Sequence, residues 1–127
     1  MLGDFDISPS LPASDIDRAK AFYETVLGFK PQMTAPDGTF FYKSGGSRFQ
    51  VYPSAFAGTN RATAAGWQVS DFDGVAAELK AKGVKFEDYD FGEIKTVDGV
   101  MALPDGSKAA WFKDSEGNIL GLFELGV

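Results

Sequence analysis

The spacing of apolar residues switches between helical and extended patterns along this chain. Between Ser14 and Gly28, apolar residues recur every three or four positions, which predicts a helix over about 15–27. Ser14 and Asp17 form a capping-box pattern at its start, and Gly28 stands where a glycine ends a helix. Strands are predicted around this helix, the first of them broken by prolines and therefore placed at a sheet edge: residues 5–13, 29–35, 39–43 and 48–52.

The same order of elements begins again at about residue 64. Ser70 and Asp73 repeat the capping pattern, and Gly83 ends a second predicted helix over 71–82. The remaining segments of this half predict short strands and a closing hairpin: residues 66–69, 84–91, 100–103 and 108–127. The order strand, helix, strand, strand, strand therefore occurs twice, which is an internal repeat.

The repeat predicts an α+β fold within a single domain, residues 1–127. It consists of two βαβββ modules, the first over about 5–53 and the second over about 64–127. One such module cannot cover its sheet, whereas two can join their strands into a curved mixed sheet, or cup, with the helices outside. The concave face of a cup suits a small ligand.

Three segments together resemble one protein superfamily. They are SDIDRAKAFYETVLGF at the first helix, GWQVSDFDGVAAELKAKGVKF around the second helix, and FKDSEGN in the closing hairpin. In this order they resemble the glyoxalase/bleomycin-resistance/dioxygenase superfamily, also called the vicinal oxygen chelate (VOC) superfamily. FEDYD, KTVDG and AAWFKD resemble a branch of its small members. The resemblance implies the two-module cup and indicates fold much better than function.

The resemblance also marks where a metal would be held. In metal-dependent members, the ligands come from the first and last strands of both modules and face into the cup. The corresponding positions in this chain are Ser8, Gln50, Ala64 and Gly121. Ala64 and Gly121 have no side-chain ligand atom, and hydroxyl and amide groups hold transition metals weakly. We therefore expect no metal and no other cofactor, which argues against the metal-dependent chemistry of the superfamily.

Alternation along the strands selects the residues that face the cup. The predicted ligand-binding residues are two amides and three aromatic side chains: Gln50, Tyr52, Gln68, Trp111 and Phe123. The pattern leaves open whether Trp111 lies in the pocket or in the core. Trp67 is predicted to lie in the core under the second helix, and Glu124 is read as an end-of-strand carboxylate near solvent.

Composition removes several classes of function. The chain has no cysteine and no histidine, which excludes disulfides, catalytic triads and imidazole metal ligands. A net charge of −6 argues against nucleic acids and anionic membranes as partners, and it favours a cationic ligand. No apolar run approaches the roughly 20 residues of a membrane span and no signal peptide is evident, so we expect a cytoplasmic protein.

Two functional hypotheses follow, with a third in reserve. The first is a metal-free binding protein that sequesters a small, preferably cationic aromatic ligand in its cup, as the resemblance to bleomycin-resistance proteins implies. The alternative is a glyoxalase-like lyase or isomerase that uses an atypical carboxylate or metal site, so that whether the chain is an enzyme stays open. The third is a protein whose cup is filled by its own side chains. The resemblance further implies a homodimer.

Overall fold

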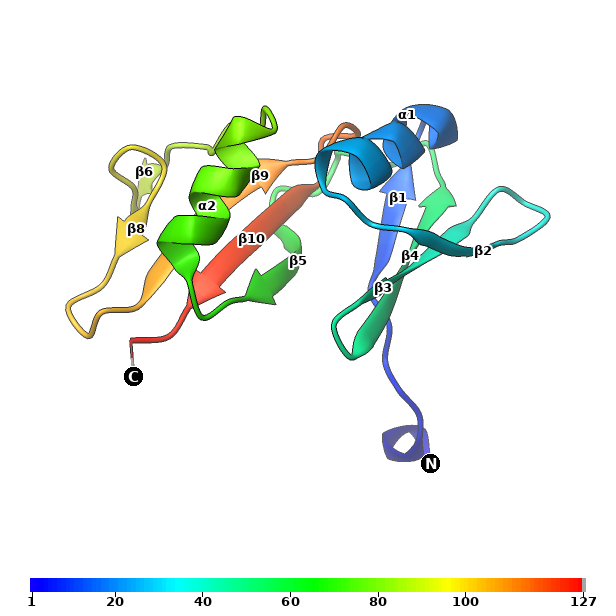
Figure 1. Ribbon diagram of the computed structural model, residues 1–127, viewed down its shortest axis with the longest axis horizontal. Helices are drawn as coiled ribbons and strands as arrows, with labels where there is room; N and C mark the ends of the chain where they lie inside the picture. Colours follow the sequence, from blue (N-terminus) through cyan, green and yellow to red (C-terminus); the bar gives the residue numbers. More distant parts are fainter. Residues whose placement is uncertain (127) are drawn as a thin grey trace.

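The computed structural model describes residues 1–126 and places two modules of similar build side by side (Figure 1). The first contains η1 (Leu2–Asp4), β1 (Ser10–Ala13), α1 (Ile16–Ala21), η2 (Phe22–Val26), β2 (Pro31–Thr34), β3 (Phe40–Ser44) and β4 (Ser47–Pro53). The second contains β5 (Thr63–Gln68), α2 (Phe72–Ala81), β6 (Asp90–Phe91), β7 (Ile94–Lys95), β8 (Met101–Ala102), β9 (Lys108–Lys113) and β10 (Ile119–Glu124). Within residues 1–126, no helix has the length and apolar character that crossing a membrane requires.

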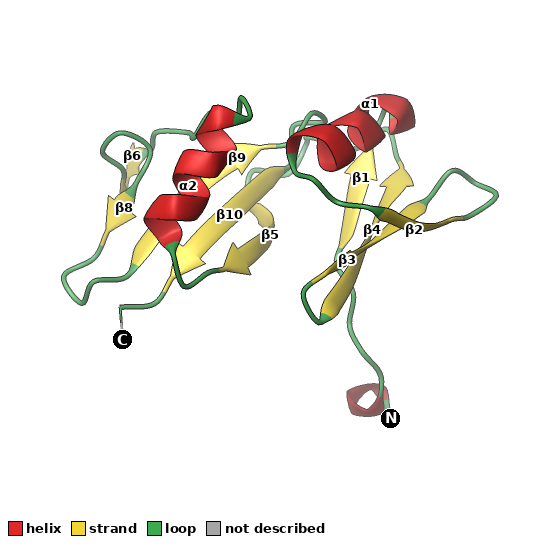
Figure 2. Cartoon of the chain, in the orientation of Figure 1, coloured by secondary structure: helices red, strands yellow, loops and turns green. Residues whose placement is uncertain are grey.

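Each module builds a four-stranded mixed sheet with the same topology (Figure 2). The strand orders are β1-β4-β3-β2 and β5-β10-β9-β8, and β6 pairs with β7 in a separate small hairpin. In both sheets the first strand runs parallel to the last, and the other neighbours are antiparallel. The predicted fold class and the repeated βαβββ order are confirmed.

The sheet arrangement differs from the prediction in one respect. The strands form two separate sheets, and no ladder of hydrogen bonds joins them among the described residues. Pro9 and Pro12 lie just before and within β1, and a proline has no N–H to offer a further strand. Side chains connect the modules instead: the indole Nε1 of Trp67 donates to Ser44 Oγ at 2.9 Å, and its ring stacks on Phe29.

The helices begin at aspartates rather than at the predicted serines. Asp15 and Asp71 are the N-caps, and their carboxylates accept hydrogen bonds from the backbone N–H groups of Arg18 and Gly74. Ser14 is unavailable as a cap because its hydroxyl donates to Glu116 in the other module. The first helix continues beyond α1 as the single π-helical stretch η2, so that the two together match the predicted span.

Alternation along the strands separates a core face from an open face in each sheet. The buried residues include the following side chains, which pack between the sheets and the helices: Leu11, Tyr23, Phe40, Tyr42, Phe49, Val51, Phe72, Phe112, Leu120 and Leu122. This burial is the main favourable term in folding. Buried polar residues also occur, and three of them lie in one short turn.

That turn, Asp114–Asn118, is called the closing turn here, and it links the second module to the first. The side chain of Glu116 is 0 % exposed and accepts hydrogen bonds from Arg18 Nε at 2.8 Å and from the backbone N–H of Asp15 at 2.9 Å. Burial alone would raise the pKa of Glu116, but these hydrogen bonds, one from Ser115 and the charge of Arg18 lower it to about 2.

Asp114 and Asn118 complete the closing turn. Asp114 Oδ2 accepts the hydroxyl proton of buried Tyr23 at 2.6 Å, and its Oδ1 accepts the backbone N–H groups of Glu116 and Asn118. Asn118 Nδ2 donates to the carbonyl of Pro12 in β1 at 2.8 Å. Every buried side-chain N or O atom in residues 1–126 has a hydrogen-bond partner, so the turn is polar but fully satisfied.

We predict that Glu116→Gln lowers the free energy of unfolding by about 2–3 kcal/mol at neutral pH, because the buried carboxylate loses the charge that pairs with Arg18. The folded-state pKa of about 2 lies below the ordinary 4.5, so the stabilisation is complete above 4.5 and is lost as the pH falls through about 2. Urea denaturation of both proteins across this range tests it: the difference should shrink as the pH drops. Glu93→Gln, at an exposed position, is the control. Equal stability of E116Q and wild type at pH 7 would refute the assignment.

Candidate functional site

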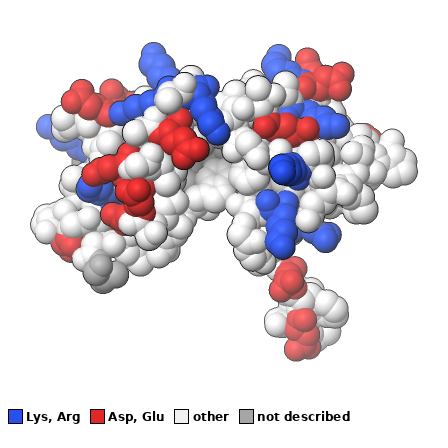
Figure 3. Space-filling view, viewed as in Figure 1, with Lys and Arg blue, Asp and Glu red and all other residues white. Residues whose placement is uncertain are grey.

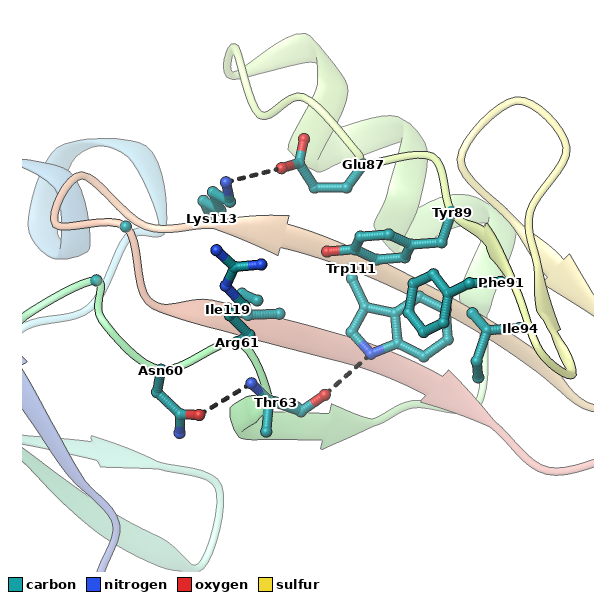
Figure 4. A pocket seen from close by; sticks show the side chains of 13 residues that line it. Asn60, Arg61, Thr63, Glu87, Tyr89, Phe91, Ile94, Trp111, Lys113 and Ile119 are labelled. Atoms are coloured by element: carbon teal, nitrogen blue, oxygen red, sulfur yellow. Dashed lines mark hydrogen bonds and ion pairs between the residues drawn. The ribbon is translucent and has the colours of Figure 1, made fainter.

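An open cleft of about 780 Å³ lies against the face of the second sheet that is turned away from the core (Figure 4). Trp111, Lys113 and Ile119 point into it from β9 and β10. Residues 58–63 of the connector between the modules form one wall, and the β6–β7 hairpin forms the other. The cleft therefore depends on three segments that are far apart in the sequence.

One end of the cleft is aromatic. Trp111 is 9 % exposed, and its ring centroid lies 5.7 Å from that of Tyr89, which in turn lies 5.6 Å from that of Phe91. The indole Nε1 donates to Thr63 Oγ1 at 3.1 Å, which fixes the orientation of the ring. The structure thus settles the position that the sequence left open: Trp111 is a wall of the cleft and not part of the core behind the sheet.

The other end of the cleft is polar. Lys113 Nζ lies 3.5 Å from Glu87 Oε1, and Arg61 also lines the cleft, toward the same end in Figure 4. The hydroxyl of Tyr89 points toward the same end. Burial, and to a lesser degree the charge of Glu87, raises the pKa of Tyr89, so its hydroxyl stays protonated and can donate a hydrogen bond.

The closing turn positions the connector that carries Arg61. The backbone N–H of Gly58 donates to Asn118 Oδ1 at 3.3 Å. Gly58 has a φ of +75°, and a Cβ there would lie 2.6 Å from the carbonyl oxygen of Glu116, so only glycine fits. Asn60 then forms a local turn by accepting the N–H of Ala62 at 3.0 Å. These contacts hold the chain across the mouth of the cleft.

The five predicted ligand-binding residues do not form one pocket. Trp111 lines the cleft, and the ring of Phe123 lies 6.2 Å from it on the same sheet face. Gln68 is exposed at the end of edge strand β5, outside the cleft. Gln50 and Tyr52 share the open face of β4, as alternation predicts, but β4 belongs to the sheet of the first module. A role for these three in ligand binding stays a prediction.

Sequence reasoning missed several residues of the cleft. Thr63 faces the cleft because β5 contains a register shift: Thr63 pairs with Ile119, and Ala65 with Leu120, so Ala64 is an extra residue. Simple alternation cannot detect such a bulge. Arg61 lies in a connector with no periodic signal, and Tyr89 and Phe91 lie where a hairpin folds over the sheet.

Comparison with known proteins supports the fold. The family model of the bleomycin resistance protein-like N-terminal region matches residues 7–43. A glyoxalase family protein from Enterococcus faecalis is similar, with a TM-score of 0.73 and 21 % identity over 98 % of this chain and 100 % of that one. The lactoylglutathione lyase from Agrobacterium tumefaciens has a TM-score of 0.70 and 19 % identity, with 94 % and 92 % of the chains covered.

A third similar structure is that of a bleomycin-binding protein complexed with bleomycin. Its TM-score is 0.70 and its identity 19 %, over 94 % of this chain and 98 % of that one. No curated protein matches the sequence. The chain thus has the fold of glyoxalase and bleomycin-resistance proteins, and the family-model match lies in its first module.

The strand register corrects two of the positions at which the resemblance would place a metal. Ser8 precedes β1, and its hydroxyl donates to the carbonyl of Arg48 at 2.7 Å, whereas Ser10 is the residue that pairs with Gln50. In the second module, Gly66 pairs with Gly121, and Ala64 is the bulged residue. The prediction of Ser8 and Ala64 assumed a fixed number of residues between the metal position and the helix N-cap. That number differs here, because Ser10 and Gly66 are the residues that pair with Gln50 and Gly121. The four facing positions are therefore Ser10, Gln50, Gly66 and Gly121.

These positions do not fit a metal. In the second module, the Phe123 ring covers the two facing glycines, and a Cβ at either Gly66 or Gly121 would overlap the ring. In the first module, Gln50 Nε2 donates to Ser10 Oγ at 2.7 Å, so the two groups satisfy each other. Residues 1–126 contain no group of three or more Asp and Glu side chains that could hold an ion elsewhere. The ring of Phe123 thus fills the space that metal-binding side chains at these two positions would need.

Glu124 has a structural role. It is half-buried, and its Oε1 accepts the backbone N–H of Phe72 at 3.1 Å, at the first turn of α2. Glu124 is thus the end-of-strand carboxylate that the sequence predicts, and in addition it contacts the start of a helix that is distant in the sequence. The negative charge at a helix N-terminus is also electrostatically favourable.

We predict that Gly121→Ala destabilises the protein by about 1–3 kcal/mol, because the new methyl group overlaps the Phe123 ring. Gly46→Ala is the control, since no heavy atom lies within 4 Å of its Cβ position. The decisive measurement is a double-mutant cycle with Phe123→Ala by urea denaturation. Gly121→Ala should lower the free energy of unfolding much less in the F123A background than in the wild type. An equal loss in both backgrounds would show that the ring does not cause the effect.

Proposed function

We propose that this chain is a metal-free VOC-superfamily protein that binds a small aromatic molecule in the cleft of its second module. The main support is the orientation of the Trp111 ring, which a hydrogen bond to Thr63 fixes. The rings of Tyr89 and Phe91 continue this surface as an aromatic wall. An indole held in place gives an arriving ring a preformed surface, and so avoids part of the entropy cost of binding. The similarity to a bleomycin-binding protein is compatible with sequestration.

The charge of the ligand is a separate question. The net charge of −6 favours a cation, which aromatic rings can also attract. Arg61 and Lys113 in the cleft favour an anion instead. The cytoplasmic location that the sequence predicts stays a prediction.

A glyoxalase-like lyase or isomerase is the alternative function. Without a metal, it would need a carboxylate in the cleft to move protons, and Glu87 is the acidic residue that lines it. Glu87 lies 3.5 Å from Lys113 Nζ, so the carboxylate faces a cation rather than an open reaction site. This ion pair favours the binding function over the enzymatic one.

The two tryptophans of this chain provide a matched test of the binding site. Trp111 lines the cleft, whereas Trp67 packs on the other side of the sheet against Phe29. We expect an aromatic ligand to quench intrinsic fluorescence in Trp67→Phe, where Trp111 reports, and not in Trp111→Phe, where Trp67 reports. Saturable quenching that persists unchanged in W111F would place the ligand elsewhere. Tyr52→Ala and Gln68→Ala test the residues that lie outside the cleft.

We further propose that the protein forms a homodimer. Three apolar side chains near the N-terminus, Leu2, Phe5 and Ile7, are between 74 % and 96 % exposed. Figure 1 shows the N-terminal end of the chain extending away from both sheets. Covering them with a second copy would remove apolar surface from water. We expect light scattering at micromolar concentration to give about twice the chain mass of 13.6 kDa. Leu2→Ser together with Ile7→Ser should weaken the association, and a monomeric wild-type protein would contradict the proposal.

A further inference from the structure

We infer that the cleft takes an aromatic ligand that carries an anionic group, with its ring against Trp111 and its anion at Arg61 and Lys113. This inference rests on the proposed binding function and specifies the chemistry of the ligand. Its basis is the separation of the cleft into an aromatic end and a cationic end, both of which Figure 4 shows.

The charge of the cleft is opposite to that of the whole chain. Its charged lining residues are Arg61, Lys113 and Glu87, two cations and one carboxylate, whereas the chain as a whole has a net charge of −6. Figure 3 shows charges of both signs over both modules rather than a uniformly acidic surface. Since electrostatic forces in salt solution act within about 10 Å, the nearby charges and not the total determine which ligand is favoured.

Arg61 is the residue that is available to an anion. Lys113 is already engaged with Glu87 at 3.5 Å, but Arg61 is exposed and has no ion pair or side-chain hydrogen bond within residues 1–126. Arg61 and Lys113 both line the cleft, and Figure 4 shows both at its polar end, so this end carries two positive charges. An anion there would be attracted by both charges, and a guanidinium offers a carboxylate two parallel hydrogen bonds.

The hydroxyl of Tyr89 adds a neutral donor to the same end. It points toward the cationic residues, while the ring to which it belongs packs against Trp111. A single rigid ligand with a ring and an attached anion would therefore contact both ends of the cleft at once. A cationic aromatic ligand would gain the same ring contacts but would bring a third positive charge beside Arg61 and Lys113.

Three compounds of one shape test the inference by isothermal titration calorimetry. Naphthalene-2-carboxylate is the anion, naphthalene-2-carboxamide is its neutral counterpart, and 2-naphthylmethylammonium is the cation. We expect the carboxylate to bind about five- to tenfold more tightly than the amide, and the ammonium compound to bind most weakly. This preference should decrease as salt is added, since the Arg61 end is open to solvent.

Variants assign the preference to a residue. Arg61→Gln should reduce the advantage of the carboxylate over the amide to less than about twofold. Arg48→Gln is the matched control, because Arg48 is an exposed arginine of the first module and its loss changes the net charge equally. R48Q should keep the full preference.

Three other results of the calorimetry would each contradict one part of the inference. A carboxylate preference that persists in R61Q, or that R48Q removes equally, would overturn the assignment to Arg61. Equal or tighter binding of the neutral or cationic compound would overturn the anionic ligand and leave the proposed aromatic binding intact. No saturable binding by any of the three compounds would refute the proposed function itself and the inference with it.

Discussion

The buried carboxylates of the closing turn are the constraint on which the rest of this structure depends. A charge that is removed from water must be compensated completely, and Glu116 is compensated by donors that belong to the first module. The turn can therefore be buried only when α1 is folded and docked against it. Asp114 likewise needs the hydroxyl of Tyr23 as a donor, and Asn118 needs the carbonyl of Pro12 in β1 as an acceptor. These hydrogen bonds therefore connect two sheets that share no ladder.

This dependence extends to the cleft. Gly58 approaches the closing turn so closely that a side chain would not fit, and the connector then leads directly to Arg61 and Thr63. Thr63 in turn fixes the indole of Trp111. Within the segment FKDSEGN, the closing turn thus holds the modules together and positions the wall of the cleft, while Lys113 lines the cleft itself.

The sequence predicted well those features that depend on short, regular patterns. Both helices, the repeated order of strands and the open face of β4 followed from periodicity, because each is determined by residues close together in the chain. The predictions failed where a residue far away decides the outcome. Ser14 does not cap its helix because its hydroxyl donates to Glu116, and Gly66 rather than Ala64 faces Gly121 because of a bulge that only the pairing with β10 reveals.

One aromatic ring fills the floor of the second sheet. At the paired positions Gly66 and Gly121, the space that side chains would have filled holds the ring of Phe123. Because that ring would overlap even a methyl group, no larger side chain fits at these positions unless Phe123 moves. The residues that remain able to bind lie toward the Trp111 end of the sheet, so the aromatic cleft and the absence of ligands at the glycine pair are two consequences of the same packing.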